Sequence, residues 1–339
     1  MRPLIIPIFI PHEGCPHRCV FCEQHKITDR QIQPMGPAHV EAILRRAVAS
    51  PRFDIRRNPE VAFYGGTFTG LPIEKMQRLI GAVSPFVKEG LIRSMRISTR
   101  PDALDEERLG LLKTHGVHTV ELGVQSMNDD VLSRSRRGHT AQDSIRAVEI
   151  LKEEGFRVGI QLMPGLPGDS PANFMKTVET VLSLKPDMVR LYPTVVIQGT
   201  ELARQYLKGT YQPLTLDSAV AVCRDAAMRF EAKDIPVIRL GLQASPSLTE
   251  KNGILAGPWH PAFGFLVRSA MYHSRIAPLL PHYGAAARIR LFVSERDVPL
   301  IRGYKNKGIC LIEKITGAEV VEVLPDERLP GKRIEVEWL

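Results

Sequence analysis

Three of the five cysteines in this chain lie close together near its start: Cys15, Cys19 and Cys22. Thiolates are soft ligands that select zinc, copper(I) or iron–sulfur clusters. Most such sites use four protein ligands. A C-x3-C-x2-C set with no fourth cysteine nearby therefore indicates a cluster with one open metal corner, where a small molecule can bind and react.

Two other interpretations of these cysteines stay open. His12, His17 or His25 could complete a Cys3His zinc site that only holds the fold together. A disulfide is less favoured, because three neighbouring cysteines leave one unpaired and the sequence shows no secretory signal. The other two cysteines, Cys223 and Cys310, lie in apolar segments and are interpreted as small core residues.

Glycine, proline and polar residues follow the apolar, strand-like runs of the chain. After the second run, Gly65, Gly66 and Thr67 form a motif whose glycines permit close approach to the backbone, either by a ligand or in a tight turn. The third run ends in Ser98-Thr-Arg-Pro-Asp102. Its proline stops regular structure, and its aspartate is suited to cap the next helix.

Later runs end in further polar motifs. The fourth ends in Glu121-Leu-Gly-Val-Gln-Ser, whose glutamine, Gln125, needs a side-chain or cofactor partner if it is buried. Arg137 follows in Arg-Gly-His-Thr and suits a carboxylate, which a guanidinium binds in bidentate geometry. The fifth ends in Gln161-Leu-Met-Pro-Gly-Leu-Pro-Gly, a turn, and the sixth in Arg190-Leu-Tyr-Pro-Thr-Val-Val-Ile-Gln-Gly-Thr.

Together these motifs resemble the radical S-adenosylmethionine (SAM) enzymes, and in particular the radical domain of the Elongator catalytic subunit. The cysteine spacing, with the aromatic Phe21 before the third cysteine, looks like the cluster signature of that superfamily. The glutamine and arginine motifs are also similar to those of oxygen-independent coproporphyrinogen dehydrogenase. The Elongator subunit has a wider cysteine spacing and a following acetyltransferase domain, for which this sequence has no room, so we expect no acetyl-CoA chemistry.

The resemblance implies that the three cysteines hold a [4Fe–4S] cluster, whose fourth iron binds the amine and carboxylate of SAM. An electron then cleaves the sulfonium, and a 5′-deoxyadenosyl radical abstracts hydrogen from a substrate. An electron donor such as flavodoxin or ferredoxin is implied as well. Ser98 stands where many relatives carry a ribose-binding carboxylate, and Gln161 where porphyrin-type relatives carry an aspartate. The SAM-binding residues implied in this way are Phe21, Gly65, Gly66, Thr67, Ser98, Gln125, Arg137 and Gln161.

The bulk properties are those of an ordinary globular protein. With 339 residues, the chain can form one sizeable core and a small further domain. Its formal net charge of +8 permits an anionic partner such as nucleic acid without establishing one. The apolar opening is too short to span a membrane and lacks the features of a signal peptide. A thiolate-ligated cluster favours a reducing cytoplasm, and we expect no membrane association.

Apolar runs alternate with segments of helical spacing over the first two-thirds of the chain. This pattern predicts an α/β fold with a parallel sheet, as a partial (β/α)6 TIM-type barrel whose chemistry lies at the carboxyl ends of the strands. We predict a barrel over residues 1–243, a connector or capping segment over 244–284 and a small α+β domain over 285–339. Strands are predicted at 5–10, 61–64, 94–97, 119–124, 158–163, 188–192 and 237–240, and helices at 40–49, 73–87, 106–113, 141–154 and 173–184.

The C-terminal segment is predicted to form a β-α-loop-α-β unit that resembles a KH domain. KH domains clamp about four nucleotides with a G-x-x-G loop. Here Gly303 matches the first glycine, and Asn306, which tolerates a left-handed backbone, replaces the second. The alternative is an unrelated small domain in which Gly303 caps a helix. The resemblance implies RNA contacts from Arg302, Gly303, Tyr304, Lys305, Asn306 and Lys307.

Three functions remain open at this point. The first is a radical SAM enzyme acting on RNA, with tRNA as a candidate substrate. The second applies the same radical chemistry to a porphyrin-like or other small molecule. The third is a non-enzymatic, zinc-stapled RNA-binding protein.

Overall fold

The computed structural model describes residues 3–16, 18–28, 35–243, 246–249 and 253–339. His17, one of the histidines considered as a zinc ligand, lies outside the described residues. The chain divides into two compact units. The first contains residues 1–215 and 230–259, and the second contains residues 216–229 and 260–339. The division after residue 259 falls inside the stretch that the sequence predicts as a connector.

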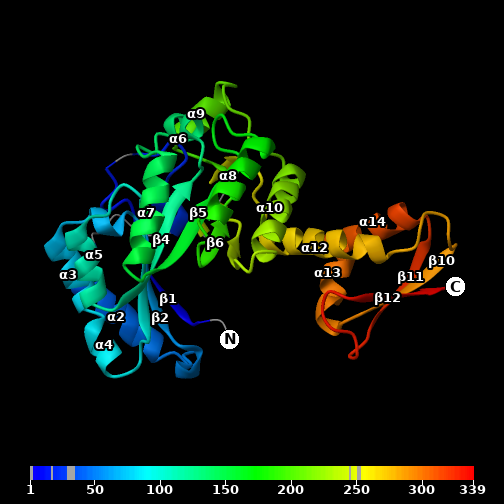
Figure 1. The fold of residues 1–339 in the computed structure, drawn as a ribbon, viewed down its shortest axis with the longest axis horizontal. Coiled ribbons are helices and arrows are strands. Elements are labelled where there is room, and N and C mark those ends of the chain that lie inside the picture. Colours follow the sequence, from blue (N-terminus) through cyan, green and yellow to red (C-terminus); the bar gives the residue numbers. More distant parts are fainter. Residues whose placement is uncertain (1–2, 17, 29–34, 244–245, 250–252) are drawn as a thin grey trace. The chain divides into compact units, whose positions relative to one another are not determined.

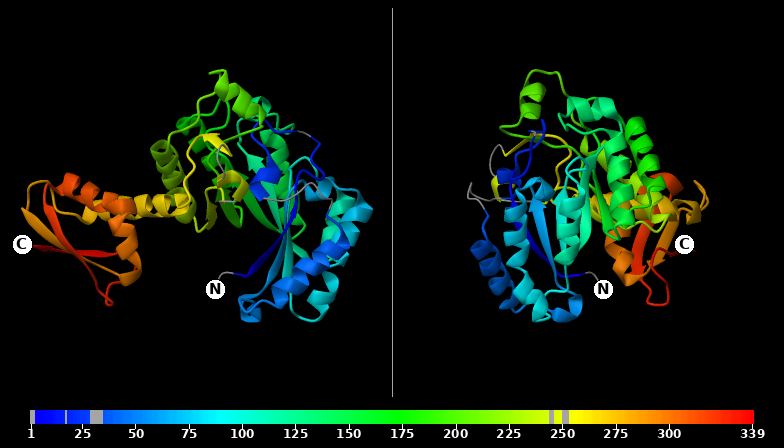
Figure 2. Two further views of the ribbon diagram at one scale, coloured as in Figure 1. Left: turned by 180° about the vertical axis from the view of Figure 1, so that it is seen from behind. Right: turned by 60° about the vertical axis from the view of Figure 1, so that its left-hand side comes forward.

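A curled parallel sheet forms the centre of the first unit (Figure 1, Figure 2). Within the described residues it has seven strands, so the predicted partial barrel is confirmed and residues 237–240 add a strand to the six. Neighbouring strands are parallel, and their carboxyl ends therefore meet at one edge, where (β/α) folds place their chemistry. In sheet order the strands are β1 (Ile5–Ile10), β2 (Glu60–Gly65), β3 (Ser94–Thr99), β4 (Val117–Gln125), β5 (Arg157–Leu162), β6 (Met188–Leu191) and β8 (Val237–Leu240).

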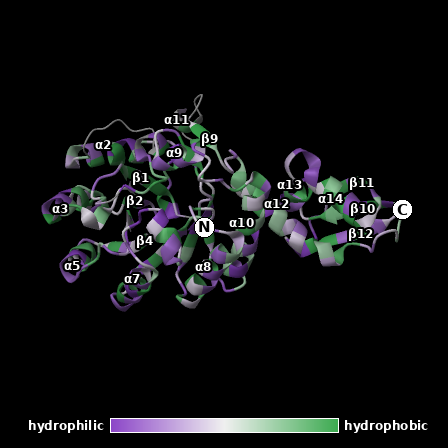
Figure 3. Cartoon of the chain, turned by 90° about the horizontal axis from the view of Figure 1, so that it is seen from above, coloured by the Kyte–Doolittle hydropathy of each residue, from purple (hydrophilic) through white to green (hydrophobic). Residues whose placement is uncertain are grey.

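Helices form an arc along the outer side of these strands (Figure 3). The start of the helix over Ala141–Glu153 is fixed by side chains: Thr140 accepts a hydrogen bond from the Asp143 N–H, and the Asp143 carboxylate accepts one from the Thr140 N–H. The helices of the first unit are α1 (Gln24–Thr28), α2 (Pro37–Val48), α3 (Ile73–Gly81), α4 (Ser84–Lys88), α5 (Glu106–Thr114), α6 (Asp129–Arg134), α7 (Ala141–Glu153), α8 (Pro171–Ser183), α9 (Glu201–Leu207) and α11 (Pro246–Thr249). Short 3-10 helices cover Ile55–Arg57 and Phe68–Gly70, and a ribbon pairs β7 (Val196–Ile197) with β9 (Ile254–Ala256).

The sequence predicts one helix over residues 73–87, and the structure divides it into α3 and α4. Pro85 lies in the first turn of α4. In a continuous helix this proline would remove a hydrogen bond to Gly81 and its ring would clash with that carbonyl. The prediction of a single helix was therefore wrong at the proline.

The second unit contains a three-stranded sheet in the order β11-β10-β12. The central strand is parallel to β11 and antiparallel to β12. Helix α12 falls in the stretch predicted as a connector, yet its Tyr272 and Ile276 belong to the core of this unit. The elements are α12 (Phe263–Ile276), β10 (Arg288–Val293), α13 (Val298–Arg302), α14 (Lys307–Thr316), β11 (Glu319–Pro325) and β12 (Ile334–Trp338), with 3-10 turns at Ala277–Leu279, Glu295–Asp297 and Tyr304–Asn306; α10 (Leu216–Glu231) precedes them.

The two isolated cysteines differ in their surroundings. Cys223 is buried, as predicted, whereas Cys310 is exposed. The second prediction was wrong because α14 buries the face that carries Gly308, Ile312 and Thr316, and Cys310 lies on another face of that helix. Among the helices of the described ranges, none combines the length and the apolar character needed to cross a bilayer.

Candidate active site

The cysteine loop follows β1 at the carboxyl edge of the sheet. Cys15, Cys19 and Cys22 are half-buried there, and none of the three is in a disulfide. Burial and then the neighbouring Cys19 and Cys15 raise the pKa of the Cys22 thiol to about 12. At neutral pH the Cys22 thiol therefore stays protonated unless a metal cation stabilises its thiolate. This soft donor set fits an iron–sulfur cluster with one corner free of protein ligands.

The zinc alternative finds less support in the same loop. The Nε2 of His12 accepts a hydrogen bond of 2.9 Å from the Gln24 N–H, which engages that nitrogen. Among the described residues, no group of three His, Cys, Asp or Glu side chains is arranged to hold a metal ion; His17 and the side chain of His25 lie outside that description, so this result bears only on a site completed by His12.

The glycine motif after β2 is joined directly to the cysteine loop. Cys15 Sγ lies 3.3 Å from the Thr67 hydroxyl. The N–H groups of Gly66 and Thr67 donate to the carbonyls of Ile10 (2.9 Å) and Glu13 (2.8 Å). The backbone at Gly66 therefore lies directly against the backbone of Ile10 and Glu13, which leaves no room for a side chain at this position. This packing is the tight turn that the sequence offered as one interpretation of the motif. A ligand amine would use carbonyl oxygens of this motif, since an amine donates its hydrogen bonds.

Arg137 reaches the cysteine loop from the segment between α6 and α7. Its Nη1 donates to Cys19 Sγ at 3.0 Å, and its Nη2 donates to the Gly123 carbonyl. Its Nε is buried without a hydrogen-bonding partner among the described residues. A guanidinium in this state has a donor left for a ligand carboxylate.

The end of β3 holds Arg137 in place, which the sequence did not reveal. Arg100 forms a fork with Asp102, with Nε–Oδ1 at 2.9 Å and Nη2–Oδ2 at 2.8 Å. Arg100 also donates to the backbone carbonyl of Arg137. The predicted capping role of Asp102 was wrong, because Asp105 caps α5 through the Arg108 N–H. Asp102 is committed to the fork instead.

Gln125 and Gln161 meet at the ends of β4 and β5. Gln161 Nε2 donates to Gln125 Oε1 at 3.1 Å, so a buried glutamine has the side-chain partner that the sequence left open. Gln125 has φ of 70°, a conformation rare outside glycine, at an irregularity between β4 and β5. A β-carbon on Gly123 would lie 2.9 Å from Gln125 Nε2 and 3.3 Å from Arg137 Nη2. Gly123 therefore lets both side chains pass over β4.

Three residues expected to bind SAM remain: Gly65, which is the last residue of β2, Ser98 and Phe21. Ser98 is half-buried on β3, in register with Glu121 of β4. Phe21 packs against an apolar cluster next to the cysteine loop, formed by Val20, Val196, Leu202, Ala203 and Tyr211.

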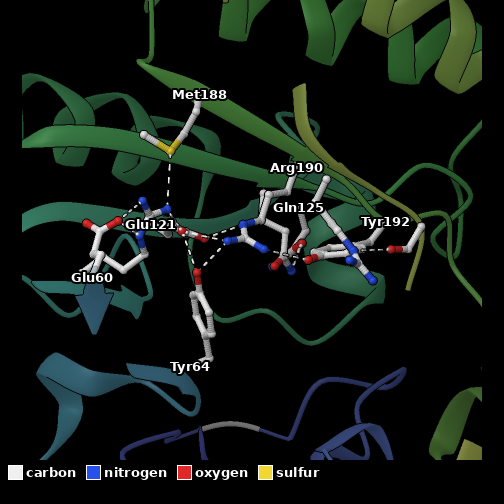
Figure 4. A network of polar contacts seen from close by, with 11 residues as sticks. Glu60, Tyr64, Glu121, Gln125, Met188, Arg190 and Tyr192 are labelled. Atoms are coloured by element: carbon white, nitrogen blue, oxygen red, sulfur yellow. Dashed lines mark hydrogen bonds and ion pairs between the residues drawn. The ribbon is translucent and has the colours of Figure 1, made fainter. Parts of the chain in front are cut away.

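A network of charged side chains, also missed from the sequence, crosses strands β2 to β6 (Figure 4). Arg96 pairs with Glu60 and, at 2.8 Å, with Glu121. Glu121 pairs in turn with Arg190 at 2.6 Å. Two carboxylates and two guanidinium groups balance each other, as buried charges require. In the sequence, this network could have been suspected from the charged residues that interrupt otherwise apolar strands.

Two tyrosines complete this network. Arg190 Nη2 donates to the Tyr64 hydroxyl at 2.7 Å, and Nη1 donates to the Tyr192 hydroxyl at 3.1 Å. Tyr64 donates in turn to Glu121 at 3.2 Å. Burial, and then the Glu121 charge, raise the pKa of Tyr64, so its phenol stays protonated at neutral pH.

The turn after β5 borders a cavity of about 450 Å³. Asp169 accepts the N–H of Gly165 at 2.9 Å, and the Tyr211 hydroxyl donates to the Gly165 carbonyl at 2.6 Å. These bonds fix the proline- and glycine-rich turn that the sequence identified.

The loop predicted to contact RNA lies in the second unit, between α13 and α14. The side chains of Arg302, Tyr304, Lys305, Asn306 and Lys307 are exposed. Asn306 adopts the left-handed conformation that the sequence allowed, with φ of 60°. Gly303 also caps the end of α13, as the alternative interpretation expected.

Comparison with known families identifies two matching models. The model described as "Radical SAM superfamily" matches residues 9–181, and the model described as "Radical_SAM C-terminal domain" matches residues 186–273.

Among curated proteins, the chain is similar to tRNA uridine(34) acetyltransferase of Methanocaldococcus jannaschii, at 28% identity over 64% of this chain and 47% of that protein. Elongator complex protein 3 of Dictyostelium discoideum is 27% identical over 62% of this chain and 45% of that protein. The chain thus spans about half the length of these relatives. Heme chaperone HemW of Lactococcus lactis is 24% identical over 94% of this chain and 89% of that protein.

A solved structure shares much of this fold. It is Elp3 of Methanocaldococcus infernus with an N-terminal deletion, with a TM-score of 0.61, 24% identity and coverage of 81% of this chain and 64% of that one. The predicted relation to the radical domain of the Elongator catalytic subunit is confirmed.

Proposed function

The chain belongs to the radical SAM superfamily, and from this premise we propose that it is a radical SAM enzyme that acts on RNA, with tRNA as its substrate. Its cofactors are those of the superfamily, a [4Fe–4S] cluster and SAM. When bound, they supply an electron and a sulfonium whose cleavage yields the 5′-deoxyadenosyl radical that takes a hydrogen atom from the substrate.

One observation carries the cofactor assignment: the cysteine loop is joined to two separate motifs. Cys15 contacts Thr67 of the glycine motif, and Cys19 contacts Arg137 of the Arg-Gly-His-Thr motif. In our proposal Cys15, Cys19 and Cys22 hold the cluster, and Arg137 binds the SAM carboxylate through its remaining donors. The other SAM contacts are Phe21, Gly65, Gly66, Thr67, Ser98, Gln125 and Gln161.

The RNA proposal is supported by the relatives and by the loop between α13 and α14. The names of the archaeal relatives state an action on tRNA uridine. Arg302, Lys305 and Lys307 are exposed in one short loop, and Lys305 Nζ lies 5.6 Å from the centre of the Tyr304 ring. Cations and an exposed aromatic ring are the groups that bind the phosphates and bases of single-stranded RNA.

A second candidate substrate is a porphyrin-like small molecule. The similarity to heme chaperone HemW extends over 94% of this chain, which favours this candidate. It predicts no affinity for RNA.

In our proposal the protein works in the cytoplasm and receives its electron from a small redox protein such as flavodoxin or ferredoxin. A cluster held by thiolates suits a reducing compartment.

The test is anaerobic reconstitution of the full chain with iron and sulfide, followed by SAM and dithionite. We expect 5′-deoxyadenosine, and a higher yield with total cellular RNA than with a porphyrin. Cys15→Ala abolishes cluster binding, whereas Cys310→Ala, at an exposed cysteine, leaves it intact. One zinc per chain without a brown chromophore would overturn the proposal, and stimulation by the porphyrin alone would favour the second candidate.

A further inference from the structure

We propose that Arg137 sets the reduction potential of the iron–sulfur cluster through its hydrogen bond to Cys19, and that Arg100 and Asp102 hold it in position for this task. The inference rests on the proposed function, because it requires that Cys19 is a cluster ligand. It assigns Arg137 a role that is separate from contact with SAM.

The first observation is the contact between a cation and a sulfur atom. Arg137 Nη1 donates to Cys19 Sγ at 3.0 Å. Reduction adds negative charge to a cluster, and hydrogen bonds and positive charge at its sulfur ligands stabilise the reduced form. A hydrogen bond from an ionised donor is about twice as strong as one between neutral groups. Arg137 therefore raises the potential of the cluster and makes its reduction easier.

The second observation is that, among the described residues, no carboxylate pairs with Arg137 and neutralises its charge. Within the described residues its side-chain partners are Cys19 and the Gly123 carbonyl, and its Nε has none. Arg137 is 6% exposed, so water and salt screen its charge little. Arg100, by contrast, is neutralised by the fork with Asp102.

The third observation is that the backbone of Arg137 is held by Arg100, the residue that follows β3. Arg100 is 4% exposed and donates to the carbonyl of Arg137, while Asp102 binds Arg100 through two parallel bonds. Bidentate geometry fixes the plane of the Arg100 guanidinium. Arg100 and Asp102 are positioning residues, since they act on the cluster only through Arg137.

The test measures the midpoint potential of the reconstituted full chain without SAM, by a redox titration followed by electron paramagnetic resonance. We expect Arg137→Met to lower the equilibrium constant for one-electron reduction at least tenfold, a shift of about 59 mV. Arg137→Lys keeps the charge but loses the planar fork, and we expect a smaller shift. The double substitution Arg100→Met and Asp102→Asn keeps the net charge and should shift the potential in the same direction, because it removes the hydrogen bond that holds the Arg137 carbonyl. Arg136→Met removes an exposed arginine from the adjacent position and leaves the potential unchanged.

The outcomes separate this inference from the proposed function. If the unmodified chain assembles no cluster, the proposed function fails first. If the cluster assembles and Arg137→Met has the unmodified potential but a weaker affinity for SAM, Arg137 acts on SAM alone and the inference is overturned. Loss of the cluster from both Arg137→Lys and Arg137→Met, with circular dichroism unchanged, would make Arg137 an assembly residue and would also overturn it.

Discussion

The carbonyl of Glu13 occupies the space that a β-carbon on Gly66 would need. Substitution of Gly66 by Ala therefore forces the cysteine loop away from the end of β2. The atoms in the way belong to the backbone of Glu13 and Ile10, which cannot move aside as the end of a flexible side chain could. We expect Gly66→Ala to lower the free energy of unfolding by about 1–3 kcal/mol, as overpacking does, and to reduce the iron bound per chain. Urea denaturation and iron analysis measure both effects.

A matched control is available in Gly110 of α5, where a β-carbon would meet nothing within 4 Å. Gly110→Ala should leave iron binding intact and stabilise the chain by about 1 kcal/mol, through helix propensity. Equal iron content in the two variants would contradict the proposed role of the contact between Gly66 and Glu13.

Glu121 is the residue on which the buried charge network depends. It pairs with both Arg96 and Arg190, and Glu121→Gln leaves the two guanidinium groups with one carboxylate, that of Glu60. Breaking a buried pair in this way costs about 3–5 kcal/mol. We expect urea denaturation to show a loss of this size that changes little between low and high salt, because the site is buried. Glu337→Gln removes the exposed carboxylate that pairs with Arg290 and should have little effect.

The buried imidazole of His139 makes stability depend on pH. Burial, and then the charges of Arg137 and Arg100, lower the pKa of His139 to about 4, while Asp102 acts in the opposite direction. The ordinary pKa of histidine is about 6.5, so between these values the unfolded chain binds a proton that the folded chain does not. Stability of the cluster-free protein therefore falls as the pH falls from 6.5 to 4, by up to about 3 kcal/mol from this residue.

The corresponding measurement is urea denaturation of the cluster-free chain at several pH values. His139→Gln should flatten the dependence between pH 6.5 and 4, whereas His118→Gln, at an exposed histidine, should preserve it. The same slope in all three proteins would show that His139 does not titrate in this window.

The elements that could be predicted from the sequence are those whose signal is local. Strands β1 to β6 are apolar runs that end in glycine, proline or polar motifs, and all of them form within a few residues of the predicted bounds. Helix α12 was missed because it directly follows a stretch rich in Gly, Pro and Ser. The composition of that stretch led to the prediction of a connector over residues 244–284. Residue type and spacing also singled out the cysteines, the glycine motif and Arg137, and the structure brings these residues into contact.

The contacts that organise the site could not be predicted, because each depends on the register between distant strands. Glu60 and Arg96 meet only because β2 and β3 pair in parallel. The sequence around either residue does not indicate which residue it pairs with. The hydrogen bond from Arg100 to the Arg137 carbonyl likewise joins the end of β3 to the segment after α6. For the same reason a partner for Gln125 was expected, but Gln161 could not be named as that partner.

The loop between α13 and α14 provides the last prediction, which concerns the substrate. If Lys305 and Lys307 meet phosphates, the double substitution Lys305→Glu and Lys307→Glu should weaken binding of single-stranded RNA. It should also reduce the slope of log K against log salt by roughly 0.7 for each phosphate that the loop no longer neutralises. The double substitution Lys314→Glu and Lys332→Glu makes the same change of charge at exposed positions of the second unit outside the loop and should leave both quantities nearly unchanged. An equal effect of the two sets of substitutions would mean that RNA responds to net charge alone, and salt-independent binding would exclude phosphate contacts from this loop.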